Sequence, residues 1–313
     1  MSQHSRREFL AQSAAGMMAL GTSGLWSSVA QSAEKPADMA IARWNGVPDL
    51  SPADFQKAAV SLTEKAIEAV GGLKRFMGRG SVVWIKPNIG WDRTPEQAAN
   101  TNPDVVATLV RLAFDAGAKR VVVGDNSCDL PPKSYAASGI PDAVKKLGAE
   151  IALVDRSRFK ETSIKGEKVK AIPMFPGILD CDLVINVPIA KHHVLAKATL
   201  CMKNYMGVIE NRKLFHQDIP TCLADITRFM KPQITVLDAM RVLVAHGPKG
   251  GNLADVRVKT TVAAGVDVVA LDALGAELLG NKPTDIGSVV KGQEVGLGKM
   301  DYRSLALREI AVS

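Results

Sequence analysis

Short apolar segments rich in β-branched residues alternate with helical segments through the first half of the chain, and this alternation constrains the fold most strongly. The predicted strands lie at residues 39–44, 82–85, 120–123 and 151–154. Helices are predicted between them, and the sequences Ser51-Pro52 and Asn102-Pro103 are typical helix starts. Fully apolar strands in a strand–helix–strand repeat are typical of parallel sheets covered on both faces. We therefore predict an α/β protein with a mostly parallel, open sheet and helices on both faces.

The second half continues this pattern after an insertion. Residues 159–174 alternate in polarity around Lys165-Gly166, which predicts an inserted β-hairpin. Further strands are predicted at residues 183–187, 234–237 and 260–264, and further helices at residues 199–208, 219–230 and 268–279. We expect residues 39–313 to form a single α/β domain.

The N-terminus resembles a twin-arginine export signal. Residues 5–10 read SRREFL, residues 11–25 are weakly hydrophobic and rich in Ala and Gly, and Ser28-Val29-Ala30 is a small-x-small cleavage site. Such a segment is a targeting signal and not part of the fold. We expect a signal peptide over residues 1–30, a linker over residues 31–38, no stable membrane span and a periplasmic mature protein. The twin-arginine translocase would then be its partner during export.

Composition limits the function classes. The formal net charge is +7, but no run of five or more basic residues occurs, which argues against nucleic-acid binding. A mildly basic surface is compatible with a small anionic ligand. The four cysteines, which form no C-x-x-C pair, give no iron–sulfur motif, and their spacing leaves their disulfide state open. They are Cys128, Cys181, Cys201 and Cys222.

Polar residues follow four of the predicted strands. They are Lys86 and Asn88, Asp125 and Asn126, residues 191–193, and Asp238. In open parallel sheets, ligands bind beyond the carboxyl ends of the strands. A lysine that follows a buried strand should be drawn to an anionic ligand or to a carboxylate, and Asp125 and Asp238 are the internal candidates. Such Lys–Asp pairs can be purely structural, but four polar strand ends together favour a binding site.

Lys191 and His193 follow the apolar strand at residues 183–187. In an extended segment they share one side, and His192 faces away. We expect them to form a general acid/base pair, with a near-neutral pKa for His193 and a lowered pKa for Lys191. Thr199 is expected to cap the next helix and to aim its N-terminus at the same crevice.

Two further features suggest binding groups. The loop Gly247-Pro248-Lys249-Gly250-Gly251 can cradle a phosphate or carboxylate with its backbone N–H groups, although it is neither a Walker A loop nor a dinucleotide fingerprint and can be a plain turn. His193 and His246 are candidate metal ligands, with His216 or Asp125 completing the set. No H-x-H or H-x-x-x-H spacing supports a metal.

Several of these motifs occur together. The combination comprises Lys-Pro-Asn at 86–88, Gly-Asp at 124–125, N-V-P-x-x-K-x-H at 186–193, Thr199 and K-N-x-x-G at 203–207, with further matches near 238, 246 and 267–272. It resembles the bacterial and archaeal domain-of-unknown-function family 362 over about residues 80–285. The resemblance implies a fold and a site but no reaction. Some members carry fused ferredoxin-like modules, whose cysteines this chain lacks.

The sequence therefore predicts an exported protein with an anionic substrate or cofactor at the carboxyl edge of its sheet. The predicted catalytic residues are Lys191, His193 and Asp125, and the predicted binding residues are Lys86, Asn88, Asn126, Thr199, Lys203, Asn204, Gly247 and Lys249. We favour an enzyme of undefined reaction, with an association to redox chemistry as one possibility that the export route suggests. A ligand-binding or cofactor-delivery protein without chemistry and a partner of an exported redox protein are the alternatives. The cofactor is undefined, and a metal and an anionic organic molecule both stay open.

Overall fold

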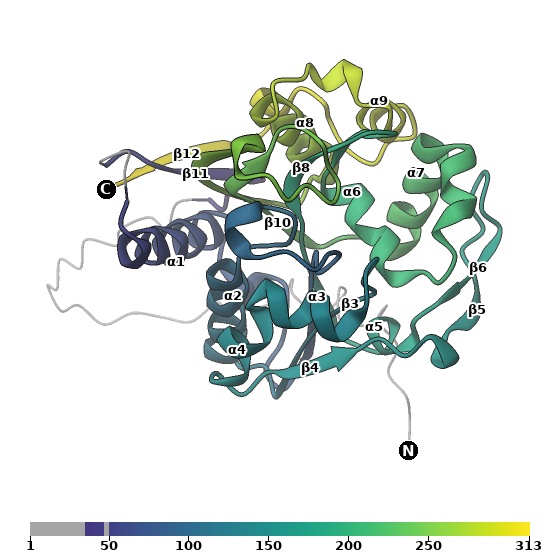
Figure 1. The fold of residues 1–313 in the computed structure, drawn as a ribbon, viewed down its shortest axis with the longest axis horizontal. Helices are drawn as coiled ribbons and strands as arrows, with labels where there is room; N and C mark the ends of the chain where they lie inside the picture. The colour runs from purple at the N-terminus through teal and green to yellow at the C-terminus, as the bar shows by residue number, and fades with distance from the viewer. Residues whose placement is uncertain (1–34, 47–49) are drawn as a thin grey trace, which may run out of the picture. The chain divides into compact units, whose positions relative to one another are not determined.

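A mixed sheet organises residues 35–46 and 50–313, which are the residues that the computed structural model describes. The predicted signal peptide and residues 31–34 of the predicted linker lie outside the described residues. Ten strands form the sheet. Figure 1 shows it surrounded by helices. Along its main path the strands are β12 (Leu307–Val312), β1 (Met39–Trp44), β11 (Val256–Gly265), β10 (Ile234–Leu243), β7 (Leu183–Val187), β2 (Val82–Pro87), β3 (Arg120–Asp125) and β4 (Glu150–Leu153).

The central strands are parallel, as predicted. β10, β7, β2, β3 and β4 lie next to one another in this order, and each adjacent pair is parallel. β11 runs antiparallel to both β10 and β1, and β12 pairs in parallel with β1. The structure thus confirms an α/β fold with a mostly parallel, open sheet. The antiparallel direction of β11 is not specified by the sequence pattern.

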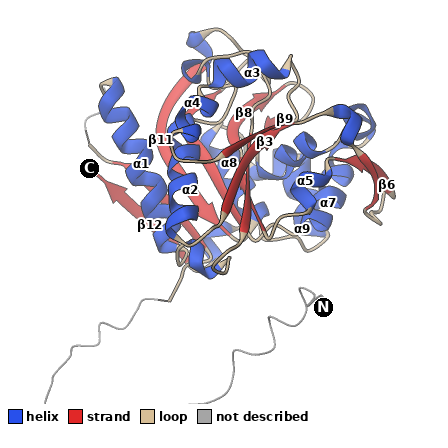
Figure 2. Cartoon of the chain, turned by 90° about the horizontal axis from the view of Figure 1, so that it is seen from below, coloured by secondary structure: helices blue, strands red, loops and turns tan. Residues whose placement is uncertain are grey.

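Helices cover both faces of the sheet, and Figure 2 shows them on either side of the strands. Because side chains alternate along a strand, Val83 and Ile85 pack into the core under one layer of helices, and Trp84 packs into the core under the other. The first layer contains α1 (Pro52–Ala69), α2 (Pro103–Asp115), α3 (Pro131–Ser138) and α4 (Ile140–Lys145). The second contains α5 (Pro176–Leu179), α6 (Cys201–Asn204), α7 (Ile219–Met230), α8 (Val268–Leu278) and α9 (Gly287–Glu294).

The predicted helix starts are confirmed by their caps. The Ser51 hydroxyl accepts the N–H of Asp54 at 3.2 Å, and Asn102 Oδ1 accepts the N–H of Asp104 at 2.8 Å. α3 has no counterpart in the sequence prediction. No helix of the described residues is both long and apolar enough to cross a bilayer.

The predicted insertion is a two-stranded antiparallel hairpin, made of β5 (Lys160–Ser163) and β6 (Ala171–Met174). Its turn docks on α7, where the Asp225 carboxylate accepts the backbone N–H groups of Glu167, Lys168 and Val169. This hairpin forms its own small sheet beside the main one.

A second hairpin follows β7. It consists of β8 (Ile189–His193) and β9 (Lys197–Thr199), which pair antiparallel, and β8 also pairs with β10. The predicted helix over residues 199–208 is therefore wrong at its start. Thr199 belongs to β9, and α6 is followed by a 3₁₀ turn, Tyr205–Val208. The backbone N–H groups of Cys201 and Met202, which open α6, donate to the buried Asp272 carboxylate of α8.

Candidate functional site

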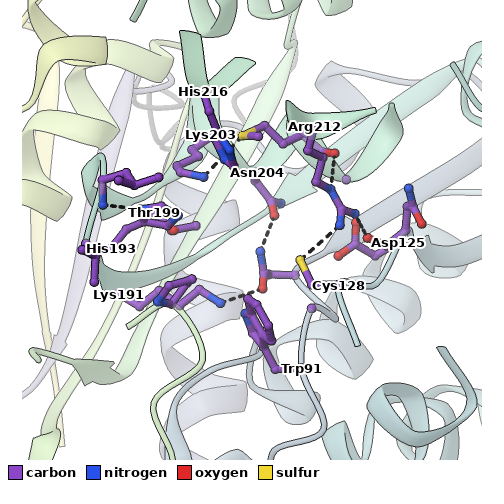
Figure 3. A pocket seen from close by; sticks show the side chains of 18 residues that line it. Trp91, Asp125, Cys128, Lys191, His193, Thr199, Lys203, Asn204, Arg212 and His216 are labelled. Carbon is purple, nitrogen blue, oxygen red and sulfur yellow. Dashed lines mark hydrogen bonds between the residues drawn. The ribbon is translucent and has the colours of Figure 1, made fainter. Parts of the chain in front are cut away.

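A cavity of about 370 Å³ lies beyond the carboxyl ends of β2 and β3, against the β8–β9 hairpin. It brings together most of the predicted site residues. Those in its wall are Asn88, Asp125, Asn126, Lys191, His193, Thr199, Lys203 and Asn204. Figure 3 shows Lys191, His193 and Thr199 on one side of this cavity and Asp125, Cys128 and Arg212 on the other.

Four predicted residues lie outside the cavity wall, namely Lys86, which lies behind it, and His246, Lys249 and Gly247. The exposed His246 has its Nδ1 2.8 Å from Asp255, so the structure does not bring it to His193. The Lys249 ammonium lies 3.1 Å from Asp129. Gly247 packs on β8, where its N–H donates to His192 Nδ1 at 3.1 Å. The glycine-rich loop contributes Pro248 to the wall instead.

Lys86 and Asp125 form a buried ion pair behind the cavity, with Nζ and Oδ1 2.7 Å apart. Burial lowers the pKa of Lys86, and the charge of Asp125 counteracts this. Asp125 also accepts the N–H of Ile89 at 2.8 Å. Gly207 packs directly on the pair, because a Cβ there would lie 1.9 Å from Asp125 Oδ1. Lys86 therefore neutralises Asp125, which is the one acidic residue among the described residues of the cavity wall.

Asp238 pairs with no lysine among the described residues, so that expectation is wrong. It lies buried within β10 and accepts the backbone N–H groups of Asn102 at 2.7 Å and Met240 at 2.9 Å. Burial raises its pKa to about 6. Asp238 thus ties the start of α2 to the sheet, and Asp125 is the one carboxylate that the described residues offer to the cavity lysines.

A chain of amides orients the floor of the cavity. Asn186 Oδ1 accepts from Asn204 Nδ2 at 2.8 Å, and Asn204 Oδ1 accepts from Asn88 Nδ2 at 3.1 Å. These two bonds fix the amide of Asn88 so that its Oδ1 faces Lys191 Nζ, 3.0 Å away. Asn186, the next-to-last residue of β7, is not among the predicted site residues.

Lys191 is 1% exposed and forms no ion pair within the described part of the chain. Its Nζ donates to two neutral oxygens, Asn88 Oδ1 and the carbonyl of Ala99. Burial lowers its pKa to about 7, and the nearby Lys203 contributes to this shift. The amine of Lys191 therefore titrates near neutral pH, as expected from its position after a buried strand.

His193 differs from expectation. Its Nδ1 accepts two backbone N–H groups, those of Leu195 and Ala196, each at 3.1 Å. The proton of the neutral ring is therefore on Nε2. Burial lowers the pKa of His193 to about 3, with further contributions from Lys203 and Lys191. His193 is thus a neutral hydrogen-bond donor at pH 7 and not a base that titrates near neutrality.

Thr199 and Lys203 present unsatisfied groups in the same wall. Thr199 does not cap α6, and its buried Oγ1 has no hydrogen-bond partner among the described residues. Lys203 is 9% exposed, and within the described residues its Nζ reaches a single acceptor, the thioether of Met206 at 3.3 Å. Burial lowers the pKa of Lys203 to about 8. Buried polar groups are normally hydrogen-bonded. The Thr199 hydroxyl and the Lys203 ammonium therefore lack an oxygen acceptor among the described residues.

Sequence reasoning missed part of the wall. Arg212 donates from Nε to the carbonyl of Met206 at 3.0 Å and from Nη1 to Cys128 Sγ at 3.1 Å, and it also contacts the carbonyl of Asn126. Trp91 also lines the cavity, and His216, a candidate metal ligand from the sequence, lies in the wall too. These residues lie on loops and short turns, where periodicity and strand-end arguments give no signal.

The wall therefore carries an excess of positive charge. Lys191, Lys203 and Arg212 face Asp125, which Lys86 already neutralises. A small anion would complete this arrangement. Within the described residues no group of three or more His, Cys, Asp and Glu side chains is placed to hold a metal ion.

Comparisons with known proteins identify the family of the chain. The chain is 25% identical over 241 residues to a thylakoid-associated protein of Synechocystis sp., covering 74% of this chain and 73% of the relative. A crystal structure from Thermotoga maritima is similar with a TM-score of 0.42 and 10% identity, covering 74% of this chain and 59% of the other. The profile described as "Domain of unknown function (DUF362)" matches residues 83–277, more than half of the chain and all the polar strand ends discussed above. The chain thus belongs to the DUF362 family.

Proposed function

We propose that this protein binds a small anion in the cavity and acts on it as an enzyme. The observation that carries the proposal is the buried ammonium of Lys203, whose single acceptor among the described residues is a thioether. Burying a charge without a partner is costly, and a bound oxyanion would remove that cost. The unpartnered hydroxyl of Thr199 supplies a second donor for such an anion.

Lys191 is the proposed acid/base group. General acid–base catalysis is most efficient when the pKa of the group lies near the working pH, and the pKa of Lys191 is about 7. Asn88 orients the amine. His193, as a neutral ring protonated at Nε2, supplies a hydrogen-bond donor to the substrate.

A binding or delivery protein without chemistry is the second candidate. The low pKa of His193 favours it, because binding an anion needs no histidine that titrates near neutrality. Turnover of a bound anion that is lost in Lys191→Met, with binding retained, would distinguish the enzyme from this candidate.

We also propose that the protein is exported to the periplasm. The SRREFL sequence at residues 5–10 and the thylakoid-associated name of the cyanobacterial relative support an exported or membrane-associated location. Replacing Arg6 and Arg7 by Lys should leave the full-length precursor in the cytoplasm. Unchanged export of that variant would contradict a twin-arginine route.

Thermal unfolding in the presence of anions tests the binding proposal. A ligand that binds only the folded state raises its stability, so acetate, pyruvate or inorganic phosphate should raise the unfolding temperature of the wild type. The shift should disappear in Lys203→Met. It should persist in Lys119→Met, which removes an exposed lysine at the opposite end of β3. Equal shifts in both variants, or no shift in the wild type, would overturn the proposal.

A further inference from the structure

The amine of Lys191 has a geometry suited to attack on a carbonyl. In its neutral form Nζ carries two hydrogens and one lone pair, and two acceptors are already in place, Asn88 Oδ1 and the carbonyl of Ala99. The remaining direction of the tetrahedral nitrogen is thus available to the lone pair. Lys191 lines the cavity but is only 1% exposed, so a reagent must enter the cavity to reach it.

The unsatisfied groups lie next to this amine. Lys191 and Thr199 are direct partners in the antiparallel β8–β9 pairing, so their side chains are neighbours on one face of the hairpin. Lys203 lies in the same wall, and its positive charge is close enough to lower the pKa of Lys191. A carboxylate held by Thr199 Oγ1 and Lys203 Nζ would therefore lie beside the amine.

We propose that Lys191 forms an imine with the carbonyl carbon of a small 2-oxo acid, whose carboxylate is bound by Thr199 and Lys203. The inference rests on the proposed anion site and specifies its substrate class. In a 2-oxo acid the carboxylate and the ketone are adjacent, which matches the adjacency of these three side chains. Trp91 and Met206 line the cavity as well and offer apolar surface to the rest of the ligand.

The chemistry balances without a further reagent. The Nζ lone pair forms a bond to the carbonyl carbon, and the carbonyl oxygen takes up a proton to give a carbinolamine. Loss of the hydroxyl group as water, with both amine hydrogens removed overall, gives the imine. The lowered pKa of Lys191 supports this step, because the neutral amine is the nucleophile. On protonation, the iminium N–H again has Asn88 Oδ1 or the Ala99 carbonyl as its acceptor.

Reductive trapping tests the proposal. The full-length protein is incubated with pyruvate and sodium cyanoborohydride at pH 7, and the modified lysine is located by peptide mass spectrometry. We expect one adduct per chain, at Lys191, and none at that peptide in Lys191→Arg. Lys119→Met should be modified at Lys191 like the wild type. In Lys203→Met, and with acetone in place of pyruvate, the rate should fall roughly tenfold or more, the size expected for a lost charged hydrogen bond.

A competition experiment on the unaltered chain guards against misfolding of the variants. Excess inorganic phosphate should slow the trapping of pyruvate at Lys191, because both anions need the same site. Thermal stabilisation by pyruvate without an adduct at Lys191 would overturn the imine proposal and leave the anion site in place. Adducts spread over exposed lysines and insensitive to phosphate would also overturn it. Absence of any anion-dependent stabilisation would contradict the proposed function itself.

Discussion

Single buried charges determine what this site can do. Lys86, Lys191 and Lys203 are all at most 9% exposed, yet only Lys86 has a carboxylate partner within the described residues. Two lysines are thus held in an environment that disfavours their charged form, and the fold tolerates this cost at the position where a ligand would relieve it.

The pH dependence of stability follows from Lys191. The pKa of Lys191 is about 7 in the folded protein, compared with 10.5 for an ordinary lysine side chain. Between pH 7 and pH 10.5 the amine of Lys191 is mostly protonated in the unfolded chain and mostly neutral in the folded protein. Lys191 therefore makes the free energy of unfolding increase as the pH rises from about 7 to about 10. Below pH 7 Lys191 is charged in the folded protein too, and the free-energy cost of burying this charge is then fully present. Denaturant titrations from pH 6 to 10 should therefore show a shallower rise for Lys191→Met than for the wild type. Parallel curves would contradict a lowered pKa.

Gly207 should be irreplaceable because of the ion pair that it touches. A Cβ at this position would lie 1.9 Å from Asp125 Oδ1 and 2.6 Å from Lys86 Nζ. Gly207→Ala must therefore separate a buried pair, which costs roughly 3–5 kcal/mol in the free energy of unfolding. Gly78→Ala is the matched control, because its Cβ would meet nothing within 4 Å. Chemical denaturation of both variants measures the difference, and an equally small effect of the two substitutions would refute this role.

Much of the site could be predicted from the sequence because it lies at strand ends. Lys86, Asp125 and Lys191 directly follow or end apolar segments, and parallel strands bring such residues to one edge. Arg212 and Trp91 lie on turns whose path depends on tertiary contacts, so no local pattern identifies them.

At the scale of elements, the β8–β9 hairpin positions the reactive groups. The alternation of an extended segment correctly places Lys191 and His193 in the cavity wall and His192 outside it. The return strand was not predicted, because residues 197–199 are too short to show a period of two. The sequence therefore predicts Thr199 at a helix start, whereas in the structure it faces Lys191 across the hairpin.

α6 depends on a carboxylate from another helix. Asp272 of α8 is buried and accepts the N–H groups of Cys201 at 2.5 Å and Met202 at 3.2 Å. Asp272→Ala leaves both donors without a partner and should lower the free energy of unfolding by roughly 2–4 kcal/mol. Because α6 carries Lys203, anion-dependent stabilisation should weaken as well. Asp272→Asn, which keeps one acceptor oxygen, should lose less. Wild-type stability of the Ala variant in denaturant would show that this cap is dispensable.

The whole molecule combines a parallel core with an antiparallel margin. The repeat of strands and helices predicts the parallel neighbours β2, β3 and β4, since their strands are short apolar segments, but β1 from the same repeat lies in the margin between β11 and β12. The order of β11 and β12 around β1 could not be predicted, because it pairs segments from the two ends of the described chain. The parallel part supplies the polar strand ends, and the later segments close the cavity around them.

The central claim is that this cavity holds an oxyanion, and anomalous diffraction from crystals soaked in selenate tests it most directly. Selenium marks the anion unambiguously in the electron density. The account predicts a peak inside the cavity, with selenate oxygens within hydrogen-bonding distance of Lys203 Nζ and Thr199 Oγ1. Peaks only at exposed lysines such as Lys249, with the cavity free of selenium, would contradict it.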